Sequence, residues 1–250
     1  MMRLTNMPRL ATLFLSTSIF FSCGENQKAS TSDSSLKIYN GTVPSDGGLI
    51  ESSTVALVSS SQGVFCTGTL IDETHVVSAA HCLANVSGTV YVGFGRNSSE
   101  FTYVEASGWA INPNYDPNFR SGTPSDISIL RLSEPAPAGY SPVDVYYGSL
   151  SSGDTLYLAG FGQTERGSSG QLYYRAVSVS NQSSDEITVS QGACYGDSGG
   201  PAYYYDGERL LVVGATSRAS SAIQRCNGGA IYSSVPYFSN WLESAAGISL

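Results

Sequence analysis

Charged side chains are scarce in this chain, and positive ones are the scarcer kind. Only 13% of its 250 residues are Asp, Glu, Lys or Arg, and 12 basic residues stand against 20 acidic ones, which gives a formal net charge of -8. A chain that neutralises phosphate groups needs an excess of Lys and Arg. We therefore expect no nucleic-acid partner.

The sequence also lacks an apolar run long enough for a transmembrane helix. The segment Leu10 to Phe21 is about a dozen residues long, whereas spanning the bilayer takes about 20. Arg3 and Arg9 precede this segment and polar residues follow Ser22-Cys23, which is the arrangement of a signal peptide. We expect residues 1–22 to direct export of the protein.

Cys23 leaves two interpretations open. The small residue before it resembles the lipobox of bacterial lipoproteins, in which the cysteine becomes the lipidated first residue of a protein in the periplasm or outer membrane. Phe20 and Phe21 depart from that pattern, so an ordinary signal peptide cleaved nearby is the alternative. Residues 23–37 are rich in Ser and poor in apolar side chains, so they cannot bury enough surface to order themselves. We expect a tether or propeptide.

The rest of the chain lacks helical periodicity and internal repeats. It holds 27 Gly and 11% aromatic residues, too much glycine for a helical bundle and too many apolar residues for a disordered chain. Short apolar and β-branched runs alternate with Gly, Ser, Asn and Pro clusters, which is typical of an all-β barrel or sandwich. Strands are expected near 54–60, 65–71, 75–79, 89–95, 101–106, 127–132, 155–161, 172–179, 186–190, 201–205, 209–216 and 229–233.

Prolines, glycines and serines in residues 134–153 predict a crossover linker between residues 38–133 and residues 154–234, each with about six strands. In residues 235–250, apolar side chains recur at spacings of three and four, which predicts one short terminal helix followed by a tail. These side chains are Tyr237, Phe238, Trp241 and Leu242.

Histidine is rarer still, with only His75 and His81 in the chain. The segment 196–201, with Ser198 in the pattern G-x-S-x-G, is shared by unrelated serine hydrolases. Such a serine needs a histidine base. Both histidines precede Ser198, whereas an α/β-hydrolase has its histidine after the serine, so chain order excludes that fold.

Three motifs follow one another in the order His, Asp, Ser. They are Ala79-Ala80-His81-Cys82, Asp126-Ile127-Ser128-Ile129-Leu130 and Gly196-Asp197-Ser198-Gly199-Gly200-Pro201. With them the chain resembles the chymotrypsin-like serine proteases from Ile38 to about Leu250. The resemblance implies an all-β fold of two six-stranded antiparallel β-barrels with a short C-terminal helix.

The same resemblance assigns roles to these residues. Ser198 would be the nucleophile, His81 the general base and then acid, and Asp126 the buried carboxylate that fixes the imidazole tautomer. The amides of Gly196 and Ser198 would form the oxyanion hole. His75 is expected to be a partly exposed strand residue with no catalytic part.

The five cysteines fit an exported protein. The resemblance pairs Cys66 with Cys82 and Cys194 with Cys226, which leaves Cys23 for lipidation. A zinc site is not expected because no Cys or His stands two to four residues from another. The acidic loop that binds calcium in some members of the family is not evident either, so we expect no metal and no cofactor.

Lys37-Ile38 resembles the family's activation junction, although Tyr39 and Asn40 depart from the usual residues. There, an activating protease would free the amino terminus of Ile38, which would then pair with the buried carboxylate of Asp197. The expected product is an active protease made from an inactive precursor.

The specificity pocket is also expected from the resemblance. In trypsin-like proteases an aspartate six residues before the nucleophile selects Lys or Arg, and here that position is Gly192. An uncharged pocket narrowed by alanine methyls favours small or medium apolar residues before the scissile bond. Arg218 stands where an aromatic residue is usual. The pocket residues are Gly192, Ala193, Ser217, Arg218, Ala219 and Ala230.

Together these patterns predict a secreted, monomeric serine endopeptidase that acts on protein or peptide substrates. The alternative is a noncatalytic binding module of the same fold at the cell surface.

Overall fold

Twelve strands form the framework of the computed structural model, which describes residues 41–118, 124–164, 167–221, 226 and 228–250. Predicted residues Cys23, Lys37 and Ile38 lie outside this set. The strands are β1 (Thr54–Ser59), β2 (Gly63–Asp72), β3 (His75–Ser78), β4 (Val90–Phe94), β5 (Thr102–Ile111), β6 (Ser128–Leu132), β7 (Thr155–Gly160), β8 (Tyr173–Gln182), β9 (Glu186–Val189), β10 (Pro201–Tyr205), β11 (Leu210–Ala219) and β12 (Ala230–Ser234).

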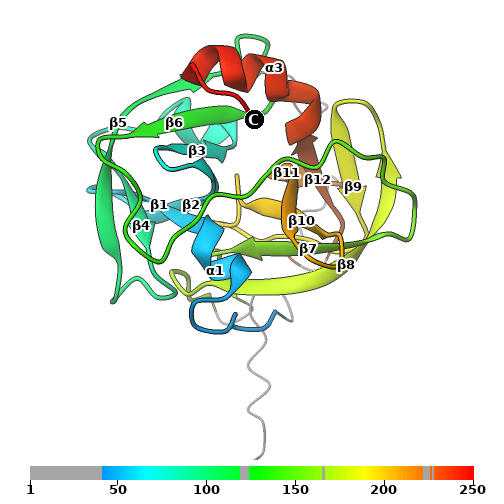
Figure 1. Cartoon of the computed structure of the whole chain (residues 1–250), viewed down its shortest axis with the longest axis horizontal. Helices are drawn as coiled ribbons and strands as arrows, with labels where there is room; N and C mark the ends of the chain where they lie inside the picture. The colour runs from blue at the N-terminus through cyan, green and yellow to red at the C-terminus, as the bar shows by residue number, and fades with distance from the viewer. Residues whose placement is uncertain (1–40, 119–123, 165–166, 222–225, 227) are drawn as a thin grey trace, which may run out of the picture. The chain divides into compact units, whose positions relative to one another are not determined.

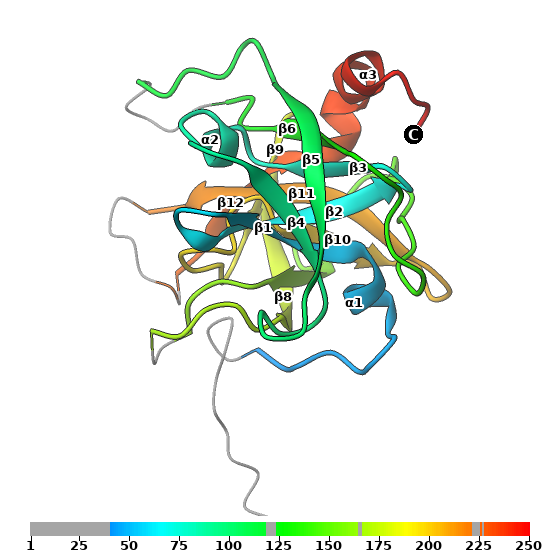
Figure 2. The ribbon, with the colours of Figure 1, turned by 90° about the vertical axis from the view of Figure 1, so that its left-hand side faces the viewer.

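The strands close into two antiparallel barrels of six, as the sequence predicts. The first barrel has the order β1-β2-β3-β6-β5-β4 and the second β10-β11-β12-β9-β8-β7. Figure 1 shows the two barrels beside each other, the first coloured from blue-cyan to green and the second from green through yellow and orange to reddish brown. Turned by 90°, the first barrel faces the viewer (Figure 2).

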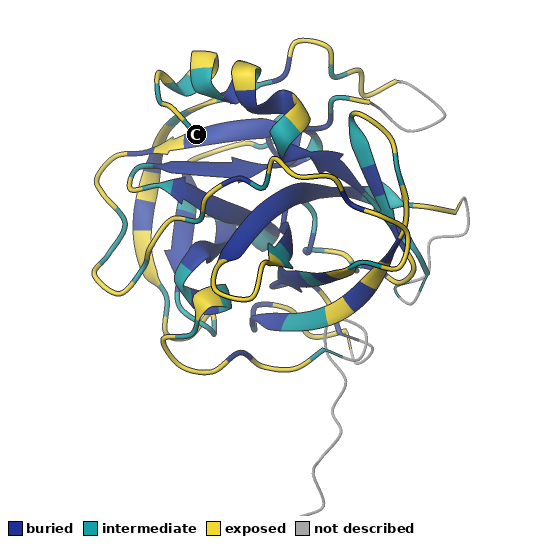
Figure 3. Cartoon of the chain, turned by 45° about the vertical axis from the view of Figure 1, so that its right-hand side comes forward, coloured by how far each residue is buried: buried dark blue, intermediate teal, exposed yellow. Residues whose placement is uncertain are grey.

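Alternating side chains of the strands fill each barrel. Leu57, Val76 and Leu130 lie in the core of the first barrel, and Leu158 and Ile187 lie in that of the second. Fully burying one such side chain contributes about 2 kcal/mol to folding. A third cluster contains residues from both barrels and the terminal helix, so it joins the three. In Figure 3 the dark blue of buried residues follows the strands, while yellow marks mostly loops and the outer turns of the helix.

The terminal helix α3 (Val235–Ala246) forms where the apolar spacing predicts it. Pro236 occupies its first turn, where a missing amide costs nothing. Gly247 ends it in the left-handed region at φ 72°, a conformation that glycine adopts without strain. Phe238 and Leu242 are buried against the barrels, and α3 contacts β6 and β11 (Figure 1).

Two short helices, α1 (Leu49–Ser53) and α2 (Ala80–Leu83), are absent from the sequence prediction. Each is about one turn long, too short for an apolar period to show. β5 and β8 also run beyond their predicted ends, because bulges after Ala106 and Val179 shift the side-chain alternation. None of the helices in the described residues is long and apolar enough to cross a membrane.

Candidate active site

His81 and Asp126 both belong to the first barrel and come together across 45 positions of its sequence. His81 lies in α2, directly after β3, and Asp126 precedes β6. Asp126 Oδ2 lies 2.8 Å from His81 Nδ1, and Oδ1 accepts the backbone amide of His81 at 2.9 Å. The carboxylate is 3% exposed and the imidazole 32%. The carboxylate therefore holds the proton on Nδ1 and leaves Nε2 as the basic nitrogen.

The backbone before Asp126 is strained. Ser125 has φ 68°, and it is the one non-glycine residue with positive φ in the described part of the chain. Such conformations cost of order 1 kcal/mol or more and gather at functional sites. Here the strained residue sits next to the carboxylate that orients His81.

Ser217 makes a contact with Asp126 that sequence analysis missed. Its Oγ donates to Asp126 Oδ2 at 2.6 Å, and Ser233 Oγ donates to the backbone carbonyl of Asp126 at 2.9 Å. Ser217 was expected only as a pocket residue, and it does line the cleft. No local motif could reveal the hydrogen bond, because 91 positions separate its partners.

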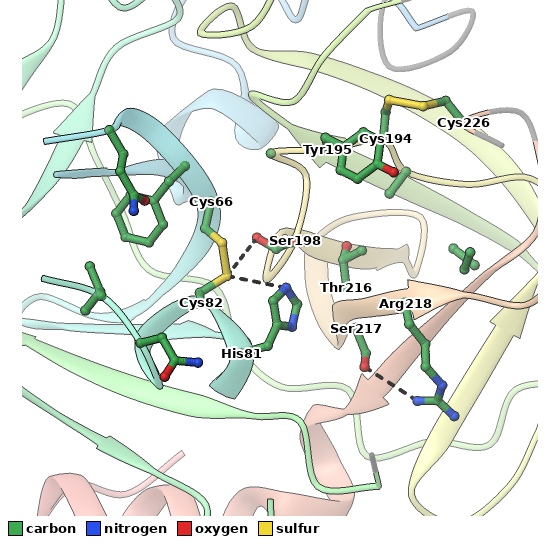
Figure 4. A pocket seen from close by; sticks show the side chains of 18 residues that line it. Cys66, His81, Cys82, Cys194, Tyr195, Ser198, Thr216, Ser217, Arg218 and Cys226 are labelled. Carbon is green, nitrogen blue, oxygen red and sulfur yellow. Dashed lines mark hydrogen bonds between the residues drawn. A yellow bond between two sulfur atoms is a disulfide. The ribbon is translucent and has the colours of Figure 1, made fainter. Parts of the chain in front are cut away.

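Ser198 lies in the turn-rich segment 194–200 that leads into β10, and it faces the same cleft as His81 (Figure 4). The cleft has a volume of about 580 Å³. Gly199 adopts φ 76°, and a Cβ there would overlap Ser78 Oγ. No hydrogen bond joins the side chains of Ser198 and His81 within the described residues; such contacts often tighten only when substrate binds.

The amides of Gly196 and Ser198 border the cleft without a protein acceptor among the described residues. Gly196 has φ 96°, which a residue with a side chain rarely adopts, and a Cβ there would lie 2.9 Å from Gly162 Cα. An oxyanion hole requires backbone amides that can donate hydrogen bonds to a substrate oxygen next to the nucleophile, and these two amides beside Ser198 are free to do so.

Asp197 carries a carboxylate sealed inside the protein, with only 1% of the residue exposed. Its oxygens accept the amides of Gly162 and Cys194, both at 2.8 Å. Burial raises the pKa of Asp197 to about 6, and the two amides act in the opposite direction. No cation pairs with it in the part of the chain that the structure describes.

A family model named Trypsin matches residues 40–242, which is most of the chain. The chain belongs to the trypsin family. Serine protease 1 and Serine protease 2 of Drosophila melanogaster are each 30% identical to it over 239 residues, which cover 84% of this chain and 84% of theirs. Chymotrypsin-like elastase family member 1 of Bos taurus is 26% identical over 212 residues, covering 72% of this chain and 78% of its own.

The predicted pocket residues of this trypsin-family chain gather at one part of the cleft. Ala193, Ala219 and Ala230 line it together with Ser217 and Arg218. Gly192 lies behind the lining, where a Cβ would come within 2.7 Å of Ala230 Cβ and 2.9 Å of Gly228 O. The described residues that line the cleft include no Asp or Glu, so nothing among them would neutralise a basic substrate side chain.

Arg218 is held by an ion pair that the sequence did not predict. Its Nη1 and Nη2 donate to the two carboxylate oxygens of Glu186 at 2.6 and 2.9 Å. Such a bidentate pair fixes the guanidinium plane as well as its charge. The Arg218 side chain is therefore a rigid part of the cleft wall, anchored to β9.

The disulfides link Cys66 to Cys82 and Cys194 to Cys226, the pairing that the resemblance implies. Ligand atoms of Cys66, His81 and Cys82 lie within 4.8 Å of one another. They do not fit a metal ion, because a disulfide offers no thiolate.

The expected partial exposure of His75 is wrong, although the residue does lie in a strand, β3. This residue is buried, 6% exposed, and its Nδ1 lies 3.0 Å from Asp72 Oδ1. Nδ1 of His75 also lies 3.2 Å from Thr74 Oγ1, and β3 is paired on both sides, with β2 and with β6.

Proposed function

We propose that the protein is a secreted serine endopeptidase, with Ser198, His81 and Asp126 as its catalytic residues. The observation that carries the proposal is the 2.8 Å contact between Asp126 and His81 in the cleft that Ser198 also lines. A serine hydroxyl becomes nucleophilic when a histidine oriented by a carboxylate can accept its proton. Membership of the trypsin family supports the same chemistry.

The reaction proceeds in two halves. Ser198 Oγ attacks the scissile carbonyl carbon while His81 Nε2 takes the hydroxyl proton, and Asp126 stabilises the resulting imidazolium. The peptide C–N bond then breaks, His81 gives its proton to the leaving amine, and the acyl group stays on Ser198. Water attacks this ester with His81 as the base, and the proton returns to Ser198 as the carboxylic acid leaves.

Negative charge on the carbonyl oxygen is stabilised by the amides of Gly196 and Ser198. Each donor is worth roughly 3 kcal/mol in the transition state. Both amides are free of protein acceptors in the described residues, so no protein hydrogen bond has to break before they receive the oxygen.

The substrate residue before the scissile bond is a small or medium apolar one. Three alanine methyls line this part of the cleft, and the packing of Gly192 against Ala230 leaves no space for a carboxylate at that position. Arg218 is neutralised by Glu186. A Lys or Arg side chain would therefore lose its hydration without gaining a counter-ion.

The protease is made as a precursor, which another protease cuts between Lys37 and Ile38. The freed ammonium of Ile38 supplies the counter-ion for Asp197, whose buried carboxylate has only backbone amides as partners in the described residues. Lipid on Cys23 holds the precursor at the cell envelope, and the enzyme acts as a monomer.

Hydrolysis of a neutral chromogenic peptide with Ala before the scissile bond tests the function. We expect turnover after the cut at Lys37, and kcat should fall at least about 10³-fold in Ser198→Ala and in His81→Ala. Ser151→Ala, which changes an exposed serine away from the cleft, should leave kcat unchanged. A cut protein with an intact fold and no turnover would instead favour a noncatalytic binding module.

A further inference from the structure

Thr67 connects the two barrels at the back of the candidate oxyanion hole. This residue of β2 is fully buried and does not line the cleft. Its Oγ1 donates to the carbonyl of Gly196 at 2.8 Å and accepts the amide of Phe161 at 3.1 Å. Its backbone amide donates to the carbonyl of Ser198 at 2.9 Å.

These three hydrogen bonds fix the segment that carries the two candidate oxyanion amides. The bonded carbonyls of Gly196 and Ser198 lie on either side of the Ser198 amide, and Gly196 contributes the other amide. Phe161 follows β7 and lies next to Gly162, whose amide binds Asp197. The Thr67 hydroxyl thus ties the serine segment to a second loop that also holds Asp197.

The chemistry at this position requires a hydroxyl. Its single proton and one of its lone pairs are both engaged, by the carbonyl of half-buried Gly196 and by the buried amide of Phe161. An isosteric Val would fill the same space, leave the buried amide of Phe161 unpaired and release the carbonyl of Gly196 from its only side-chain donor among the described residues, so the segment would be free to move.

We propose that Thr67 is a positioning residue for the reaction: its hydroxyl holds the Gly196 and Ser198 amides where the oxyanion forms. The inference rests on the proposed function, because the amides act only if Ser198 reacts. Oxyanion donors must lie about 3 Å from the developing charge, so a small displacement of the segment weakens transition-state binding and leaves substrate binding nearly unchanged.

The kinetic test compares three variants of the cut enzyme on one peptide substrate. Thr67→Val should lower kcat about 10- to 100-fold with KM within about threefold, and Thr67→Ser should keep kcat within about threefold of wild type. Thr54→Val is the matched control, because Thr54 is also buried with its hydroxyl bound, to Tyr203 Oη at 2.9 Å, away from the cleft. Equal losses in Thr67→Val and Thr54→Val, or a change in KM alone, would overturn the proposal.

Hydrogen exchange distinguishes failure of this inference from failure of the proposed function. It is measured on the cut protein whether or not that protein turns over. Amides of residues 194–200 should exchange at least tenfold faster in Thr67→Val than in wild type, Thr67→Ser or Thr54→Val. Unchanged exchange in Thr67→Val would refute the positioning role even in an active enzyme.

Discussion

The buried carboxylate of Asp197 makes the stability of the uncut precursor depend on pH in a defined way. Its pKa is raised from 3.8 to about 6 in the folded protein. The folded state therefore binds the proton more tightly than the unfolded state does. Protonation of Asp197 therefore stabilises the folded precursor fully below about pH 4, and this contribution to the free energy of unfolding is lost as the pH rises through about 6.

The size of the effect follows from the difference between the two pKa values. One unit is worth about 1.4 kcal/mol, so the precursor should lose roughly 2 to 3 kcal/mol of stability between pH 4 and pH 8 through this group alone. For a protein of this size that corresponds to roughly 4–12 °C in Tm.

The assay is thermal unfolding of the uncut chain at pH values from 4 to 8, in a Ser198→Ala background that prevents self-digestion. Asp197→Asn is the comparison, because the amide does not titrate. Its lost hydrogen bond to Gly162 or Cys194 lowers the whole curve without tilting it. The Tm difference between the two proteins should change by roughly 4–12 °C across this range.

Cutting after Lys37 should remove this pH dependence, because the Ile38 ammonium favours the ionised carboxylate. Parallel curves for wild type and Asp197→Asn in the precursor would refute the raised pKa of Asp197. Identical pH dependence before and after the cut would refute the activation pair.

Three further outcomes are expected. Asp126→Asn should lower kcat roughly 10³- to 10⁴-fold, because the carboxylate no longer keeps the proton of His81 on Nδ1. Ser217→Ala removes one of the hydrogen bonds to that carboxylate and should lower kcat only about 3- to 10-fold. Steady-state kinetics on one peptide measures both variants, and equal losses would contradict the role of Asp126 in orienting His81. Profiling on a peptide library should show cleavage after Ala, Val or Leu and little after Lys or Arg, and dominant cleavage after basic residues would contradict the reading of the pocket. Cell fractionation should find the precursor in the membrane fraction and the protease in the soluble fraction after the cut at Lys37. The Cys23→Ala precursor should be soluble before any cut. A cut protease that stays in the membrane fraction would contradict the lipid-anchor hypothesis.

The strands follow from local patterns, whereas the closure into two barrels and the roles of the candidate catalytic residues come from the resemblance that three short motifs carry. Each strand is a short apolar or β-branched run between turn residues, and His81 and Ser198 sit in short motifs whose order excludes another hydrolase fold. These features depend only on residues that are close together in the sequence, so they can be recognised in one sequence alone.

Contacts between distant segments could not be foreseen. Thr67 and Gly196 are 129 positions apart, and Arg218 and Glu186 are 32 apart. Nothing in the spacing of an ordinary strand threonine marks it as a partner of the serine segment. The burial of His75 depends in the same way on the strands β2 and β6 that pair with β3.

The most direct test of the central claim is covalent labelling of the cut protein with a fluorophosphonate, followed by mass spectrometry of its peptides. The reagent needs a serine activated by a base. We expect one adduct, on the peptide containing Ser198, that is absent in Ser198→Ala and forms at least about 10³-fold more slowly in His81→Ala. Absence of labelling in a folded, cut protein, or an adduct that persists in Ser198→Ala, would contradict the central claim.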